Sequence, residues 1–171
     1  MSNADDLLEK MREAYPDGIP NLFRTLTGNR AVLAGFMALD GCLETEGALT
    51  PAERLLVGLI TAQHFECAYC QSALSKEAKE AGADAAAVAA VLQNAVPHQM
   101  RARNLVLATQ RILEMHGRLP KAEIAYFSRF DLDEEALLEV IGVVGEFTIA
   151  THANNLVRTR IDPEYRADDQ S

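Results

Sequence analysis

The chain has 171 residues, of which 49% are apolar and 24% are charged, a balance typical of a globular protein and not of a disordered one. Its length allows one domain, 1–171, which buries about two-thirds of the surface of the unfolded chain. The formal net charge is -9. Nucleic acids and anionic membrane surfaces are therefore not expected partners, because both attract clustered cations.

The first residues carry neither the positive charges nor the apolar stretch of a secretory signal, so we expect a cytoplasmic protein. The longest apolar stretch, 140–150, is shorter than the ~20 residues that cross a bilayer, and it contains Glu146. It predicts a buried helix in which a structural salt bridge neutralises Glu146. Because this helix is apolar on most faces, the sequence also predicts a homo-oligomer that covers it.

Apolar residues recur at spacings of three and four, and the alternating pattern of strands is absent, so the sequence predicts an all-α fold. The expected helices cover residues 5–14, 19–26, 30–44, 51–81, 85–94, 98–115, 119–127 and 133–160. The clearest boundary is the start of the fourth, where Thr50 can cap the helix and Glu53 can reach back to the cap. Gly82 ends this helix, which can also break near Glu66.

Other helix starts also carry capping residues. Asn29 and Asp84 are expected to cap the helices at 30–44 and 85–94. Asp131, with Glu134 three residues later, is expected to form a capping box for the last helix.

Two of the three cysteines, Cys67 and Cys70, are separated by two residues, and His64 precedes them. In a continuous helix, residues three apart share a face, so His64, Cys67 and Cys70 would lie along one edge. An imidazole can accept a thiol proton, and the resulting thiolate attacks a peroxide or a disulfide. An oxidised thiol becomes a sulfenic acid, which condenses with the second thiol to a disulfide and water. These three residues are therefore the candidate catalytic residues.

The same cysteine spacing also occurs in metal sites and in passively buried pairs, and both alternatives stay open at this point. Zinc needs four ligands, and the other candidate ligands, Cys42, His98, His116 and His152, are distant in the sequence. We therefore expect no metal and no bound cofactor. Cys42 is expected to be a small buried side chain. The capping role of Glu53 accounts for its presence.

Three segments resemble the core motif region of the carboxymuconolactone decarboxylase and alkylhydroperoxidase D superfamily: Leu49 to Leu59, Cys67 to Cys70, and Lys79 to Gly82. The resemblance covers a motif-bearing core at about 48–95. It implies an all-helical alkylhydroperoxidase D-like fold, assembled as a homo-oligomer, with the cysteines beside a helix-lined pocket. It also implies reduction of hydroperoxides by the cysteine pair, or, as in other members, a decarboxylation that does not need both cysteines.

The acid-base residues of that family are missing from this chain. In the family, a glutamate twelve residues before the first cysteine and a histidine four after the second form a proton relay; here these positions hold Leu55 and Leu74. Histidines found elsewhere in the motif of other members are replaced by Tyr69 and Ala73.

Either cysteine is therefore a candidate for the thiol that attacks first. The resemblance implies that Cys70 attacks and Cys67 resolves. His64 lies one turn before Cys67 and favours Cys67 as the activated thiol.

We predict a dithiol oxidoreductase with alkylhydroperoxidase-like peroxidase activity. It reduces hydroperoxides or disulfides through Cys67 and Cys70 and needs an external thiol reductant. One alternative is a decarboxylase or related lyase acting on a small acid, and another is a non-catalytic thiol redox module. Candidate groups for the lyase are His98, Arg101, His152 and Arg158.

Overall fold

The structure is a computed structural model that describes residues 9, 11–13, 15–16 and 18–166. All regular elements in these residues are helical, which confirms the predicted all-α class. The predicted helix at 5–14 falls mostly outside the described residues, although 9 and 11–13 are helical. The elements are α2 (Asn21–Leu26), α3 (Arg30–Glu46), α4 (Pro51–His64), α5 (Ala68–Glu80), α6 (Ala85–Leu92), α7 (Met100–Met115), α8 (Lys121–Phe127), η1 (Ser128–Phe130), α9 (Glu134–Val157) and η2 (Pro163–Tyr165).

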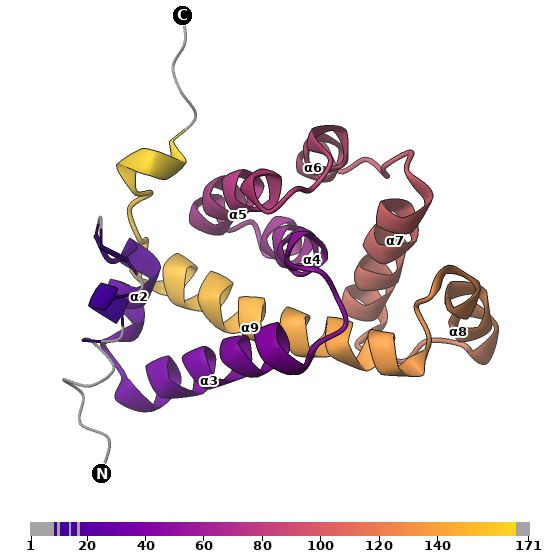
Figure 1. Cartoon of the computed structure of the whole chain (residues 1–171), viewed down its shortest axis with the longest axis horizontal. Helices are drawn as coiled ribbons and strands as arrows, with labels where there is room; N and C mark the ends of the chain where they lie inside the picture. The colour runs from indigo at the N-terminus through magenta and orange to yellow at the C-terminus, as the bar shows by residue number, and fades with distance from the viewer. Residues whose placement is uncertain (1–8, 10, 14, 17, 167–171) are drawn as a thin grey trace, which may run out of the picture.

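Two helices organise the packing. Helix α9 runs along the molecule beside α3, and α4 lies between α9 and α5 (Figure 1). Helix α9 packs against α2, α3, α4, α5 and α7, and α4 packs against α5, α6, α7 and α9. The short η2 near the C-terminus returns to α5. Residues close to both ends of the chain thus lie near the start of α5.

Helix α9 extends beyond the apolar stretch at 140–150 in both directions. Its 24 residues are long and apolar enough to span a membrane by length and composition. In the structure, one side of the helix is a core face at spacings of three and four, formed by buried Leu137, Val140, Val143, Phe147 and Ala150. Burying each of the larger of these side chains contributes about 1.5–3 kcal/mol. This face holds α9 against the other helices.

Helices α4 and α9 approach closely at Gly58. A Cβ atom at this position would lie 2.6 Å from the ring of Phe147. Only glycine leaves room for the aromatic ring at this crossing, which fixes the distance between the two central helices.

The predicted caps hold in most places. Asn29 Oδ1 accepts a hydrogen bond from Ala31 N at 3.0 Å. Thr50 Oγ1 accepts from Glu53 N at 3.2 Å, and Glu53 Oε2 accepts from Thr50 N at 2.9 Å, so the predicted capping box is confirmed.

The predicted capping box of Asp131 and Glu134 is wrong. Asp131 adopts a left-handed conformation with φ 57° and ends η1. The N-cap of α9 is Asp133, whose Oδ1 accepts from Ala136 N at 3.0 Å. The sequence offers two aspartates two positions apart, and the left-handed turn at Asp131 leaves the second to cap the helix.

The predicted helix at 51–81 is two helices. Helix α4 ends at His64, Glu66 adopts a left-handed conformation with φ 52°, and Cys67 N donates to Ala62 O at 2.9 Å. This pattern is that of a Schellman C-cap, with glutamate in the position usually held by glycine. The chain turns there, and Cys67 begins the new helix α5.

Candidate functional site

The two neighbouring thiols lie at the N-terminus of α5, and both are buried. Cys67 is the N-cap residue, and its Sγ accepts a hydrogen bond from Cys70 N at 3.4 Å. Free backbone N–H groups and the positive end of the helix dipole face a sulfur at this position. The break after α4 therefore places Cys67 where a helix stabilises a thiolate.

The two thiols share one proton. The Cys67 pKa falls to about 7 because the Cys70 thiol donates a hydrogen bond to it, and the N–H groups of Cys70 and Tyr69 also favour its thiolate. Donating that bond, burial and the charge on Cys67 together raise the Cys70 pKa. Near neutral pH about half of the molecules thus carry one negative charge and one proton on the pair, and moving this proton between the sulfurs exchanges their roles.

Asn154 of α9 also contacts Cys70. Its Nδ2 donates to Cys70 Sγ at 3.3 Å, and its side chain is buried. This bond stabilises negative charge on Cys70. Sequence reasoning missed Asn154, although an asparagine near the end of an otherwise apolar helix was a usable signal.

The structure does not bring His64 to the thiols. The predicted single edge of His64, Cys67 and Cys70 is wrong, because the chain reverses direction between α4 and α5 at Glu66. His64 is exposed, packs edge-on against the ring of Phe65, and lines a different cavity beside α6 and α7. Among the described residues, no hydrogen bond joins His64 to either sulfur.

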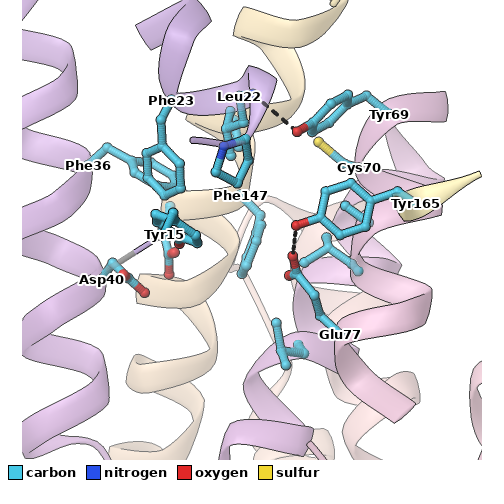
Figure 2. Close-up of a pocket in the computed structure, with 16 residues that line it drawn as sticks. Tyr15, Leu22, Phe23, Phe36, Asp40, Tyr69, Cys70, Glu77, Phe147 and Tyr165 are labelled. Atoms are coloured by element: carbon cyan, nitrogen blue, oxygen red, sulfur yellow. Dashed lines mark hydrogen bonds between the residues drawn. The ribbon is translucent and has the colours of Figure 1, made fainter. Parts of the chain in front are cut away.

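Cys70 lines a cavity of about 130 Å³ between α3, α5, α9 and the segments at both ends of the described chain. Figure 2 shows its sulfur at one side and Asp40 at the opposite side, with aromatic rings between them. Cys67 is not among the lining residues. The cavity thus opens onto Cys70 and not onto Cys67.

Leu55 and Leu74, at the positions of the family's relay, both line this cavity. Their apolar side chains face the space where the resemblance places acid-base groups. The carboxyls of the cavity, Asp40, Glu77 and Glu146, come instead from α3, α5 and α9.

Tyr69, in the place of a family histidine, ties the C-terminal segment to the site. Its hydroxyl donates to Asp162 Oδ2 at 2.6 Å and accepts from Leu22 N at 3.1 Å. Nearby, Tyr165 of η2 donates to Glu77 Oε1 at 2.6 Å (Figure 2). Burial and the bonds to these carboxylates raise the pKa of both tyrosines, so both stay protonated and hold η2 over the cavity.

The predicted salt bridge of Glu146 is not formed. Glu146 is 3% exposed, and its carboxyl faces the carboxyl of Asp40, not a cation. Burial and the charge of Asp40 raise its pKa to about 8. Arg54 reaches Asp40 from α4, with Nη1 4.0 Å from Asp40 Oδ1. Sequence reasoning could not place Asp40 opposite Glu146, because the two residues are more than a hundred positions apart.

Other residues singled out by the sequence lie away from the thiols. Cys42 is exposed on α3, so its expected burial is wrong; at position 42 the helix faces outward. Glu53 completes the cap of α4 and binds Arg101, whose Nε is 2.6 Å from Glu53 Oε1. His152 is exposed and packs against Phe65.

Within the described residues, no group of three or more His, Cys, Asp or Glu side chains is arranged to hold a metal ion. A low-pKa thiolate, a second thiol in hydrogen-bond contact and an adjoining cavity are the parts that two-electron oxidation to a disulfide requires.

The sequence profile of the Carboxymuconolactone decarboxylase family matches residues 30–111. Both paired cysteines lie inside this segment. This segment is similar to that family. The match extends beyond 48–95, the core on which the resemblance depends, and takes in α3 and most of α7.

Solved structures share the family's helical architecture with this chain. An alkylhydroperoxidase AhpD core, described as an uncharacterized peroxidase-related protein from Ralstonia eutropha JMP134, superposes with a TM-score of 0.83 at 19% identity. An uncharacterized peroxidase-related protein from Silicibacter sp. TM1040 gives 0.78 at 16% identity. In both cases the match covers 94% of this chain and 87% of the other. At these identities the likeness shows the alkylhydroperoxidase D-like fold. No curated protein matches the chain significantly.

Proposed function

We propose that this protein is a dithiol peroxidase that reduces organic hydroperoxides through Cys70 and Cys67. The observation that carries the proposal is that Cys70 faces a cavity while sharing one proton with Cys67, which stabilises the charge of the pair. The lowered pKa of Cys67 gives the pair thiolate character near neutral pH, and the cavity makes Cys70 the sulfur that a substrate reaches.

Cys70 is the attacking residue in this proposal. As its proton passes to the Cys67 thiolate, the Cys70 sulfur attacks the terminal oxygen of ROOH and the O–O bond breaks. The products are the Cys70 sulfenic acid and an alkoxide, which takes a proton to become ROH. Asn154 Nδ2, 3.3 Å from the sulfur, stabilises the charge that develops on Cys70. Access makes Cys70 the first nucleophile, because Cys70 lines the cavity and Cys67 does not; Cys67, the neighbouring thiolate, takes the proton of Cys70.

Cys67 then resolves the intermediate. Its sulfur attacks the sulfenic sulfur, a disulfide forms, and the hydroxide that leaves combines with the proton of Cys67 as water. The peroxide gains the two electrons that the thiols lose. An external thiol reductant of unspecified identity returns them by thiol–disulfide exchange, and a small-molecule disulfide is an alternative oxidant for the same pair. A reducing cytoplasm supplies such thiols and suits this cycle.

The cavity argues against a lyase that acts on a small acid. A carboxylate substrate needs a cation near it, yet the described residues that line the cavity include carboxyls and no lysine, arginine or histidine. The groups considered for that chemistry lie elsewhere: His98, His152 and Arg158 are exposed, and Arg101 is bound to Glu53.

We also propose that a second copy of the chain covers the outer face of α9. Leu138, Ile141, Leu156 and Val157 are exposed there, although α9 is otherwise the central helix. Exposed large apolar side chains near both ends of one helix are typical of protein interfaces, and a closed homo-oligomer buries them symmetrically.

The test is oxidation of the reduced protein by cumene hydroperoxide, with thiol counting and mass spectrometry of the peptide that holds both cysteines. We expect loss of two thiols and a peptide lighter by two hydrogens. In Cys67→Ser the oxidation should stop at a sulfenic acid on Cys70, which dimedone traps. Cys42→Ser is the matched control and should behave as the wild type, because Cys42 lies outside the site.

Two results would overturn the proposal. Thiols that stay inert for hours would favour a non-catalytic redox module. If Cys70→Ser instead forms a trappable sulfenic acid on Cys67 at the wild-type rate, Cys67 is the attacking residue and the proposed order is wrong.

A further inference from the structure

The cavity beside Cys70 combines carboxyls with aromatic walls. Asp40, Glu77 and Glu146 line it together with the rings of Tyr15, Phe23, Phe36, Phe147 and Tyr165. Of these carboxyls, Glu77 has a donor, the Tyr165 hydroxyl. Asp40 lies at the side of the cavity away from Cys70 (Figure 2), and its carboxyl forms a hydrogen bond with that of Glu146.

The carboxyls of Asp40 and Glu146 form a hydrogen bond with each other, and among the described residues that line the cavity no cation faces them. Glu146 is 97% buried, and no backbone or side-chain N–H of the described residues donates to it. Asp40 is half-exposed at the mouth of the cavity, where Arg54 approaches it from the α4 side. The titratable and charged groups around Glu146 are Asp40 on α3, Arg54 on α4, Cys70 and Glu77 on α5, and Tyr15 and Tyr165.

Charge balance shows what the pair lacks. Two carboxylates and the Arg54 guanidinium leave one negative charge, which a proton on Glu146 cancels at neutral pH because burial raises its pKa to about 8. A cation that donates hydrogen bonds can replace this proton and satisfy both carboxylates. The ligand that completes the pair is therefore a monovalent cationic donor.

The aromatic walls select an organic cation. Rings attract an ammonium group through their negative faces and pack against apolar carbon. A metal ion fits poorly, because the carboxyls of the described residues do not converge as a metal-binding group. The volume of about 130 Å³ limits the apolar part of the ligand to about one small ring, since a cavity of about 150 Å³ holds benzene, and the charged end lies toward the half-exposed Asp40.

We propose that this cavity binds a small organic ammonium ion, with its charged end between Asp40 and Glu146 and its apolar part against the aromatic walls. One consequence of this proposal rests on the proposed peroxidase function. The hydroperoxides that fit the cavity carry an amine at one end and the –OOH group at the other end, which lies at Cys70. Anionic hydroperoxides, such as those of fatty acids, are excluded by the same carboxyls.

The experiment is calorimetric titration of the reduced full-length protein with benzylamine, benzyl alcohol and benzoate, which share a ring and differ in charge. We expect benzylamine to bind about tenfold or more tightly than the alcohol, and benzoate not to bind. Repeating the titration in buffers of different ionisation enthalpy should reveal release of about one proton per benzylamine at pH 7, since the ammonium displaces the proton of Glu146.

Variants test the location. Glu146→Gln should weaken benzylamine binding by about tenfold or more and abolish the proton release. Asp40→Asn, at the cavity mouth, should weaken it as well and serves as the second variant if Glu146→Gln disturbs folding. Glu80→Gln is the matched control, because its carboxylate lies in solvent on the same helix as Cys70 and should leave binding unchanged.

The outcomes separate this proposal from the peroxidase proposal. Equal binding of all probes, no binding of benzylamine, or the same affinity in Glu146→Gln overturns the ammonium site, whatever the peroxide assay gives. Benzylamine binding that persists in Cys70→Ser, in a protein that does not reduce peroxides, supports the ammonium site and leaves only the peroxidase proposal refuted.

Discussion

Replacing Glu146 with glutamine should stabilise the protein, and the gain should depend on pH. Burial raises the pKa of Glu146 from 4.5 to about 8 in the folded chain. The folded protein therefore binds a proton more tightly than the unfolded chain does at this residue. Stability is lost as the pH rises from the lower value to the higher one, because only the unfolded chain ionises freely in that range.

The size of the stability difference follows from the two pKa values of Glu146, 4.5 in the unfolded chain and about 8 in the folded protein. Each pKa unit corresponds to about 1.4 kcal/mol, so the easier ionisation of Glu146 in the unfolded chain lowers the free energy of unfolding by about 3 kcal/mol at pH 7 and about 5 kcal/mol above pH 8. Glutamine has the same shape and never ionises. Glu146→Gln should therefore match the wild type at pH 4 and exceed its free energy of unfolding by these amounts at pH 7 and pH 8.5.

Urea unfolding followed by circular dichroism at the three pH values measures this difference, at one protein concentration because an oligomer's stability depends on it. Glu80→Gln is the control and should stay within about 0.5 kcal/mol of the wild type at each pH, since its side chain is exposed. A Glu146→Gln protein that is less stable than the wild type at pH 8.5, or a difference that does not change with pH, would refute the reasoning.

Three further changes test the site and the helix crossing. Asn154→Ala removes the donor to Cys70 Sγ and should slow peroxide-dependent oxidation by about tenfold, with little change in the alkylation of Cys42; an unchanged rate in stopped-flow assays would remove Asn154 from the mechanism. His64→Gln should leave the pH profile of thiol alkylation unchanged because His64 does not reach the sulfurs, and a shifted profile would restore it as the base. Gly58→Ala places a Cβ against Phe147 and should destabilise the fold by about 1–3 kcal/mol in urea unfolding; wild-type stability would contradict the close helix crossing.

Local features of the fold follow from the sequence because their causes lie within a few residues. The Thr50 and Glu53 capping box begins α4 as predicted, since each side chain bonds to backbone three positions away. A break near Glu66 was among the predicted possibilities and is confirmed, but its left-handed turn was not predicted, because glycine usually holds such a position and this chain has glutamate there. The sequence also could not show which of the aspartates at 131 and 133 caps α9, because the choice depends on the left-handed turn at Asp131.

The sequence by itself determined the all-helical class, the resemblance to the family and the cysteine pair, because helix periodicity and a two-residue spacing are properties of short segments. Tertiary structure alone decided what surrounds the pair. Asn154 reaches Cys70 from α9, and Asp40 meets Glu146 at one side of the cavity, through contacts between segments far apart in the chain. Such contacts depend on how helices cross, as at Gly58 and Phe147, and no local pattern encodes that geometry.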